Sequence, residues 1–316
     1  RGDDKGSAYI FERDSNDNWT FKERFIATDD GADNNFGYSV AISGNYAIVG
    51  APYDDIPNNN ALQNTGGAYI FERNRDGTWN QKPKLTASDA VSNDKFGESV
   101  AISGNYAIIG AVGGNNSTGS AYIFERNSYG DWEQKTELTA DDAESNDKFG
   151  ESVAISGNYA IVGSRLNDDV SPSSGSAYIF ERNSDGTWNQ KSKLLSSDKA
   201  PSDEFGMSVA ISGIYAIVGA VYDDDYAANS NSGSAYIFEI NSDGTWGESV
   251  SGQTYRTENQ KIMPSHIVKF TQFGNSVAIS GNYAIVGAEL GDHKAWEYWY
   301  DEGAAYIFER NSDGTW

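Results

Sequence analysis

Runs of aspartate recur in this sequence at a position where their carboxylates could bind a metal ion. They lie four to six residues after a glycine that ends a β-branched stretch, and they comprise Asp54, Asp55, Asp168, Asp169, Asp223, Asp224 and Asp225. Carboxylates that gather with amide and carbonyl oxygens suit Ca²⁺, which takes roughly six to eight oxygen ligands. Their spacing does not match an EF-hand loop, so solvated loops with turn-forming aspartates remain the alternative interpretation.

A second candidate group is aromatic and falls between Gly291 and Glu302. The group consists of Asp292, Trp296, Tyr298, Trp299 and Tyr300, with four rings in five positions. Such a segment is typical of a contact patch for a partner protein or of stacking against sugar rings. The alternative, equally open, is a loop that folds its rings inward to complete the core. Tyr53 and Tyr222, each directly before an aspartate run, are further candidates for ligand or partner contact.

Composition excludes several classes of function. The 316 residues carry a formal net charge of -23, which argues against binding to nucleic acid or to an anionic lipid surface. No apolar run approaches the roughly 20 residues that span a bilayer. Cysteine is absent and only two histidines occur, and the sequence has neither a Gly-x-Ser-x-Gly elbow nor a glycine-rich phosphate loop. We therefore expect a protein that is not an enzyme, although paired carboxylates keep a hydrolase as a minor alternative.

The elements that must position these residues follow from an internal repeat. Tyr-Ile-Phe-Glu begins at Tyr9, Tyr69, Tyr122, Tyr178, Tyr236 and Tyr306. Phe-Gly precedes Ser-Val-Ala-Ile-Ser at Phe36, Phe96, Phe149, Phe205 and Phe273, with one residue between the two phrases. Each unit contains four strand signals, here named A to D: 99–103 (A), 106–110 (B) and 121–126 (C) in one unit, and 188–195 (D) in the next. Four antiparallel strands in a repeat of this length predict the blade of a β-propeller.

The repeat predicts an all-β chain with five visible blades of four antiparallel strands. We expect one β-propeller domain over residues 1–316, with blade units that start near residues 36, 96, 149, 205 and 273. Residues 1–28 would complete the last blade, so that pairing of the N- and C-terminal strands closes the ring and removes exposed edges. One C strand is left over in this scheme, either Tyr9 to Arg13 or Tyr306 to Arg310.

The repeated phrases resemble a known family. Phe36-Gly37 followed by Val49-Gly50-Ala51-Pro52 resembles the FG-GAP repeats of the integrin alpha-subunit propeller, and the units are more similar still to FG-GAP repeat proteins of microbial cell surfaces. The resemblance implies the propeller fold and an adhesive, non-catalytic role. Integrin-type repeats often carry a calcium loop between strands A and B, but here that position reads Ser-Gly-Asn-Tyr without carboxylates. Those calcium sites are therefore not expected in this chain.

The alternating strand direction predicts which face carries function. The B–C loops and the D–A connections share one face, and nearly all the length variation of the repeat falls in them. We therefore expect an extracellular or cell-surface module for adhesion or for subunit packing, with a protein partner or further copies of itself. The alternative is a lectin-like propeller that binds glycans through Trp296 and Trp299, and this binding could depend on Ca²⁺. Neither nucleic acid binding nor membrane insertion is expected.

Overall fold

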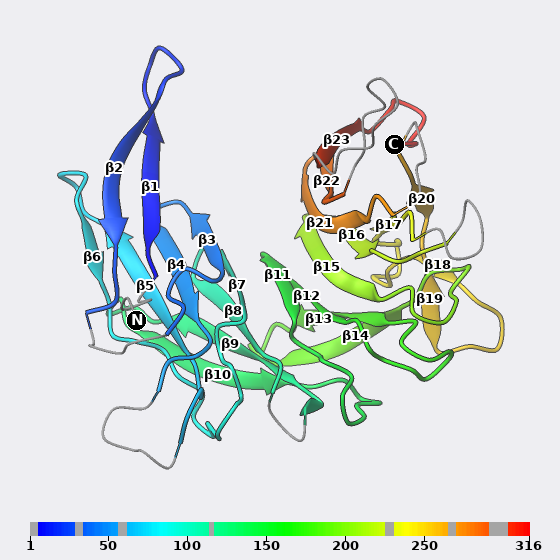
Figure 1. The fold of residues 1–316 in the computed structure, drawn as a ribbon, viewed down its shortest axis with the longest axis horizontal. Coiled ribbons are helices and arrows are strands. Elements are labelled where there is room, and N and C mark those ends of the chain that lie inside the picture. Colours follow the sequence, from blue (N-terminus) through cyan, green and yellow to red (C-terminus); the bar gives the residue numbers. More distant parts are fainter. Residues whose placement is uncertain are drawn as a thin grey trace. The chain divides into compact units, whose positions relative to one another are not determined.

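The computed structural model describes residues 6–28, 34–55, 62–113, 117–224, 231–264, 270–290 and 303–316. The regular elements of these residues are the strands β1 to β23 (Figure 1). The chain divides into two compact units, residues 1–138 and 139–316. Within the described ranges, no helix has the length and the apolar character needed to cross a membrane.

Unit 1 contains a hairpin and two complete blades. The hairpin consists of β1 (Ala8–Arg13) and β2 (Trp19–Phe25). Blade 1 consists of β3 (Val40–Ser43), β4 (Tyr46–Ala51), β5 (Gly67–Arg73) and β6 (Trp79–Gln81). Blade 2 consists of β7 (Ser99–Ser103), β8 (Tyr106–Ala111), β9 (Ser120–Arg126) and β10 (Trp132–Leu138). In each blade, neighbouring strands are antiparallel and follow one another in sequence, which matches the predicted order A to D.

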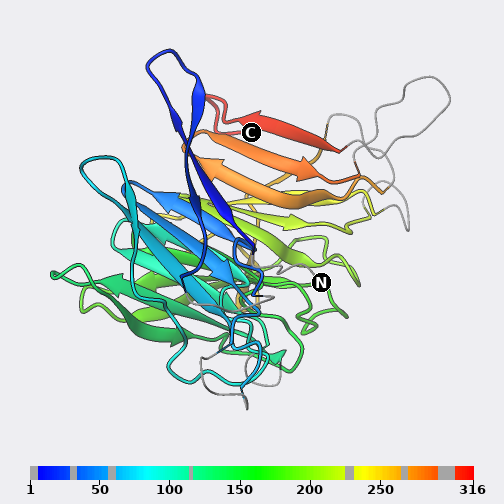
Figure 2. The ribbon, with the colours of Figure 1, turned by 60° about the vertical axis from the view of Figure 1, so that its left-hand side comes forward.

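Unit 2 contains three further blades. Blade 3 consists of β11 (Ser152–Ser156), β12 (Tyr159–Ser164), β13 (Ser176–Arg182) and β14 (Trp188–Leu194). Blade 4 consists of β15 (Phe205–Ser212), β16 (Tyr215–Ala220), β17 (Ser234–Glu239) and β20 (Gln260–Ile262). Blade 5 consists of β21 (Phe273–Ser280), β22 (Tyr283–Ala288) and β23 (Ala304–Glu309), which lie side by side in Figure 2. The predicted all-β fold with five β-propeller blades is confirmed, and in the described residues blades 1 to 4 are four-stranded and antiparallel, whereas blade 5 has three antiparallel strands.

An insertion within blade 4 was not anticipated. Between β17 and β20 the chain forms β18 (Glu248–Ser249) and β19 (Tyr255–Thr257), and β19 adds in parallel to the outer edge of β14 in blade 3. Two further predictions are left open by the described strands. Pairing of the N- and C-terminal strands would join the two units, and both this closure and the single domain over 1–316 stay predictions.

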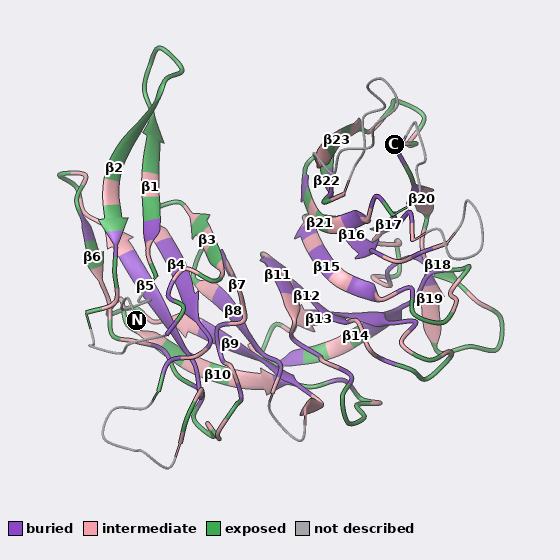
Figure 3. Ribbon diagram, in the orientation of Figure 1, coloured by how far each residue is buried: buried purple, intermediate pink, exposed green. Residues whose placement is uncertain are grey.

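Strand B is buried on both faces, which explains its continuous apolar sequence. In β8, Ala107, Ile108 and Ile109 have no exposed surface, and Figure 3 shows the same burial along β4. A strand that is second in its sheet and covered on both sides has no solvent face, so the usual alternation of polar and apolar residues disappears. The β1–β2 hairpin differs, because much of it is exposed in Figure 3 and Trp19 is 68% exposed.

The Phe-Gly phrase at the start of strand A makes two contacts: the phenylalanine ring packs within its own blade, and the glycine lies against the backbone of the preceding blade. Phe205 is fully buried, and its ring packs edge-on against Tyr236 and Phe238 at centroid distances of 5.4 and 6.0 Å. Gly206 follows it with φ +95°, and a Cβ atom there would lie 2.2 Å from the carbonyl oxygen of Ser176 in the preceding blade. Glycine is therefore required both by the backbone conformation and by the close approach of the neighbouring backbone.

We expect Gly206→Ala to destabilise the protein far more than Gly213→Ala. Both glycines have positive φ, but a Cβ atom on Gly213 would meet nothing within 4 Å. The strained backbone alone should lower the free energy of unfolding by about 1 kcal/mol at Gly213, and the added clash should bring the loss at Gly206 to about 3 kcal/mol or more. Urea unfolding followed by tryptophan fluorescence measures both. Equal losses would show that the close approach between blades is not needed.

Candidate functional site

A lysine of the outermost strand lies among the loop aspartates in blade 3. The ammonium of Lys193 donates to Asp142 at 2.6 Å, to Asp169, and to the amide oxygen of Asn167 at 3.3 Å. The hydroxyl of Tyr178 donates to the other oxygen of Asp142 at 2.9 Å, and the ammonium lies 5.5 Å from the centre of this tyrosine ring. We call these residues the blade-3 cluster. It joins a D–A connection, a B–C loop and strand D through one buried cation.

Blade 4 repeats the arrangement with Lys261 at its centre. The Lys261 ammonium lies 2.5 Å from Asp198 and 2.6 Å from Asp223. The hydroxyl of Tyr236 lies 3.0 and 2.8 Å from carboxylate oxygens of the same two aspartates, and its ring centre is 5.1 Å from the ammonium. This is the blade-4 cluster. Asp198 comes from the D–A connection and Asp223 from the B–C loop, as in blade 3.

Blade 1 has a third cluster of the same kind. Lys84 pairs with the buried Asp54 at 2.5 Å, and the hydroxyl of Tyr69 donates to the same carboxylate. The amide of Asn34 donates to the other oxygen of Asp54 at 3.1 Å, and the Lys84 ammonium lies 5.6 Å from the Tyr69 ring centre. The blade-1 cluster therefore also holds an ammonium over a tyrosine ring, a geometry that adds cation–π attraction to the ion pair.

Backbone hydrogen bonds join the same two loop types. Leu166 N donates to Asp147 O at 3.3 Å, and Tyr222 N donates to Asp203 O at 3.3 Å. In the other direction, Glu204 N donates to Ser173 O at 3.2 Å, which ties one blade's D–A connection to the preceding blade's B–C loop. Within each unit, B–C loops and D–A connections thus lie together, as the strand directions predict.

Burial and ion pairing shift the pKa values of the acidic side chains in opposite directions. Burial alone would raise the pKa of Asp169 and of Asp198, but the hydrogen bonds and charges of Lys193 and Lys261 outweigh it, and both pKa values lie below the usual range. Among the described residues, no lysine forms an ion pair with Asp203. Its burial, and then the charges of Asp223 and Asp198, raise its pKa to about 7 against the hydrogen bond from Ala200 N.

The structure gives most of the predicted metal ligands another partner. Asp54, Asp169 and Asp223 each bind a lysine ammonium, so a protein cation stands where the calcium hypothesis places Ca²⁺. Asp55 and Asp224 accept loop backbone N–H groups, from Asn64 at 2.7 Å and Asn231 at 2.6 Å. Asp168 lies close enough to Asp147 for the two charges to interact.

Calcium binding by these residues stays a prediction. In the described part of the chain, no group of three acidic or histidine side chains has an arrangement that could hold a metal ion. Asp225 lies outside the described residues.

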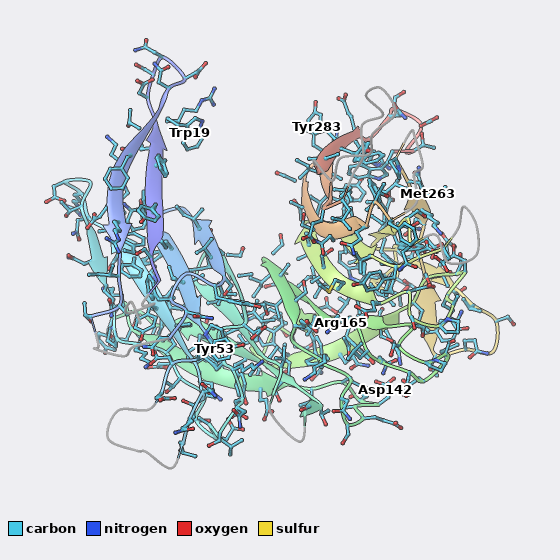
Figure 4. All side chains as sticks on the ribbon, viewed as in Figure 1. Trp19, Tyr53, Asp142, Arg165, Met263 and Tyr283 are labelled. Carbon is cyan, nitrogen blue, oxygen red and sulfur yellow. The ribbon has the colours of Figure 1, made fainter. Side chains whose placement is uncertain are left out.

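Of the candidates for ligand or partner contact, Tyr53 and Tyr222 fall within the described residues. Asp292, Trp296, Tyr298, Trp299 and Tyr300 lie outside the described residues. Tyr53 and Tyr222 are half-buried at the start of their B–C loops, and the ammonium of Lys95 lies 5.3 Å from the Tyr53 ring centre. Figure 4 labels Tyr53 at the loop end of unit 1, and Trp19 near the turn of the β1–β2 hairpin. The role of these rings in ligand contact stays a prediction.

Sequence reasoning missed the lysines. Lys84 and Lys193 each lie five residues after the tryptophan that opens strand D, and in both cases a leucine follows directly. The recurrence of lysine at this position was the available signal, but neighbouring residues of a strand face opposite sides, so a buried leucine beside it did not indicate a buried lysine. The polar appearance of strand D instead favoured an outer, solvated strand.

The family model described as FG-GAP repeat matches residues 19–71, 79–124, 132–180, 188–238 and 257–308. This chain belongs to the FG-GAP repeat family. A crystal structure of a protein from Lactobacillus plantarum is similar, with 12% identity, 82% of this chain and 69% of that chain covered, and a TM-score of 0.49. No curated protein matches the chain. Each matched FG-GAP segment includes the phenylalanine, glycine and tyrosine positions that the clusters and blade contacts use.

We expect Lys193→Met to destabilise this FG-GAP repeat protein strongly. The lysine side chain is only 10% exposed, and its loss leaves two carboxylates without a counter-charge, which should lower the free energy of unfolding by about 3–5 kcal/mol. Lys191→Met is the matched control, since its pair with Glu181 at 3.0 Å is more exposed and should contribute about 1 kcal/mol or less. Chemical denaturation measures both, and similar losses would contradict a structural role for the cluster.

We expect Asp203→Asn to change how stability depends on pH. The raised pKa means that folded Asp203 keeps its proton up to about pH 7, whereas the unfolded chain releases it near 3.8. Rising pH therefore favours unfolding of the wild type between these values, by at most about 1.4 kcal/mol per pH unit from this group. The difference in the free energy of unfolding between the variant and the wild type should therefore grow in favour of the variant from pH 4 to pH 7. Above pH 7 this difference should stay constant, as chemical denaturation at a series of pH values measures.

The control for this experiment is Asp185→Asn. Asp185 is exposed, and hydrogen bonds from Thr187 hold its pKa below 3.8, so it is ionised in both the folded and the unfolded state from about pH 5 upward. Its variant should therefore keep a constant offset from wild type between about pH 5 and 7. A flat difference for Asp203→Asn as well would show that this carboxyl is not perturbed.

Proposed function

We propose that this FG-GAP propeller is a non-catalytic interaction or structural module of an extracellular or cell-surface protein. Its B–C loops and D–A connections form the recognition surface, and its partner is another protein or a further copy of the module. The proposal concerns adhesion or packing in an extracellular assembly. The family membership and the propeller fold are its starting point.

The observation that carries the proposal is a contrast within the B–C loops. The ends of these loops next to the strands, here called the loop bases, are held by the lysine clusters, whereas their middle parts, the loop tips, vary. The A–B turns have two residues in every blade, at 44–45, 104–105, 157–158, 213–214 and 281–282. The B–C segments run over 52–66, 112–119, 165–175, 221–233 and 289–303 and differ in both length and sequence. Because the clusters hold the bases of these loops, the tips can vary without disturbing the blades. Rigid scaffolds with diversified loops are typical of recognition proteins.

The shifted pKa values of the buried aspartates have a structural cause, which supports a role without catalysis. Strongly shifted pKa values are often a sign of an active site, but ion-pair networks produce them too. Here Asp169 and Asp198 pair with lysines that join three chain segments, and Asp203 lies next to the blade-4 cluster. These groups are therefore accounted for by the stability of the loop bases.

Sedimentation velocity and a glycan array, with and without Ca²⁺, test the proposal. We expect self-association or binding to a protein partner and no saturable binding of sugars. Trp299→Ala should weaken the association at least tenfold, because aromatic anchors commonly carry most of the energy of an interface. Tyr129→Ala is the control, since this residue is 90% exposed in the C–D turn of blade 2, at the other end of the strands.

Two outcomes would contradict this function. Saturable sugar binding that Trp299→Ala abolishes would establish the lectin-like alternative instead. A loss of association with Tyr129→Ala alone would place recognition on the opposite face.

A further inference from the structure

The β1–β2 hairpin has the sequence of strands C and D of a blade. Strand β1 contains the Tyr-Ile-Phe-Glu phrase of a C strand, and β2 opens with the tryptophan of a D strand. In the described residues these two strands form a sheet of their own, so the edge of β1 that faces away from β2 has no neighbouring strand. In all five blades the same edge of strand C pairs with strand B. A free strand edge is a template for the addition of another strand.

Within the described ranges, the aromatic residues of β1 lack the ring that covers their counterparts in every blade. In each blade the phenylalanine of the Phe-Gly phrase packs against the tyrosine and the phenylalanine of strand C, at ring-centre distances of 5.3 to 6.2 Å. The equivalent residues of the hairpin, Tyr9 and Phe11, are 56% and 53% exposed. The sequence has six C-strand phrases and five Phe-Gly phrases, and all five phenylalanines are used within their own blades.

The face of blade 1 next to β1 is exposed as well (Figure 3). Val40 and Ile42 of β3 are 61% and 60% exposed. At the same positions of blade 2, Val100 and Ile102 are 8% and 7% exposed, because strands A and B of blade 1 pack against them. A groove of about 490 Å³ lies between β1 and strands β3 and β4, and its lining is almost entirely apolar. The groove is therefore an uncovered part of a contact that other blades complete.

The hairpin already makes the outer half of a contact between two blades. Phe25 of β2 stacks on Phe71 of blade 1 at a ring-centre distance of 4.0 Å. Gly6 bridges to Phe36 in parallel, as Gly66 does to Phe96 between blades 1 and 2. The hairpin thus lies against blade 1 as strands C and D of a preceding blade would. The uncovered groove beside it is the place of strands A and B.

Two groups at the end of β1 lack, in the described part of the chain, hydrogen bonds that strands A and B provide elsewhere. In every blade a backbone N–H at or just after the end of strand C donates to a carbonyl of the A–B turn, at 2.8 to 3.0 Å. In four blades a tyrosine of strand B also donates to the glutamate of strand C, at 2.7 to 3.0 Å. Neither Arg13 N nor Glu12 has the corresponding bond among the described residues.

We infer that the free edge of β1 binds a further A–B hairpin of the FG-GAP type, from outside residues 1–316, and that this addition completes a four-stranded blade. The incoming B strand pairs antiparallel with β1, and the incoming phenylalanine covers Tyr9 and Phe11. A second copy of this chain is not the expected donor, because the B strand of each of its blades is paired with its own C strand. The inference goes beyond the proposed function, because a blade edge rather than the loop tips makes the contact.

Fluorescence anisotropy with a labelled peptide tests the inference. The peptide has the sequence of residues 96–111, Phe-Gly-Glu-Ser-Val-Ala-Ile-Ser-Gly-Asn-Tyr-Ala-Ile-Ile-Gly-Ala, which contains strands A and B of blade 2. We expect saturable binding of one peptide per chain. Absence of saturable binding would overturn the inference.

Two altered peptides test the mode of binding. Phe96→Ala removes the ring that covers Tyr9 and Phe11, and it should weaken binding at least about tenfold. Ile109→Pro removes a backbone donor from the strand that pairs with strand C, and it should abolish binding. Equal binding of the proline peptide would show that the peptide attaches without strand pairing, which contradicts the inference.

Variants of the protein locate the peptide. Phe11→Ser in β1 and Val40→Ser in the opposite wall of the groove should each weaken binding at least about tenfold. Both side chains are more than half exposed, so the blades should remain folded. Val91→Ser is the matched control, because Val91 is 51% exposed in a D–A connection that does not line the groove, and it should bind the peptide as wild type does. If Phe11→Ser unfolds the hairpin, Val40→Ser decides, and unchanged binding in that variant would contradict the assignment.

Amide hydrogen exchange separates the possible occupants of the edge. The free-edge amides of β1 should exchange rapidly in the protein alone and slowly with the peptide. Slow exchange in the monomeric protein alone would show that the chain's own strands cover the edge, as ring closure requires, and would overturn the inference. Slow exchange that appears only with self-association would identify a second copy as the occupant and would overturn it too.

The Trp299→Ala variant separates this inference from the proposed function. This variant should lose the association that the loop tips make but bind the peptide as wild type does. A loss of peptide binding in Trp299→Ala would place the peptide on the loop surface and overturn the inference.

Discussion

Within each unit, consecutive blades lie so close together that a backbone oxygen occupies the place where a side chain would begin. A Cβ atom on Gly50 would lie 2.1 Å from the carbonyl oxygen of Gly97, and one on Gly219 would lie 2.0 Å from that of Gly274. Only glycine permits this distance, so the Phe-Gly and Val-Gly phrases of the repeat are two halves of one contact. The spacing of the blades, and with it the position of every loop base, depends on that contact.

Charge placement within the blades follows from the same geometry. Close packing leaves the loop bases half-buried, where a carboxylate without a partner is costly and a lysine beside it is stabilising only when its ammonium is bonded. Blades 1, 3 and 4 meet this requirement with a lysine that lies in strand D in blades 3 and 4 and shortly after it in blade 1, and the tyrosine of strand C completes the bonding. A repeat protein whose whole chain has a net charge of -23 can therefore still bury a single lysine in each of several blades.

The sequence predicted the strands and their order well, because the repeat displays every strand five or six times. It could not predict which face Lys193 occupies. A β-bulge between Ile179 and Phe180 shifts the register of strands C and D by one residue, which places Lys193 opposite Tyr178. A shift of one residue turns a side chain to the other face of the sheet, so the role of this lysine depended on a feature without a sequence signal. The added strands β18 and β19 were invisible for a related reason, since they are two and three residues long and lie outside the repeat.

The near-identity of the strands has a consequence for how the chain reaches its native state. Strand C reads Ala-Tyr-Ile-Phe-Glu in β5, β9, β13 and β17, so each copy can pair with the B strand of any blade at the native register. Mispaired arrangements of this kind are the characteristic traps of repeat proteins. Proximity along the chain distinguishes the correct partner. The free energy needed to close a B–C loop of 8 to 15 residues is lower, by about 1 kcal/mol, than that of a loop longer by a whole repeat. Short connections, rather than strand chemistry, therefore select the native pairing.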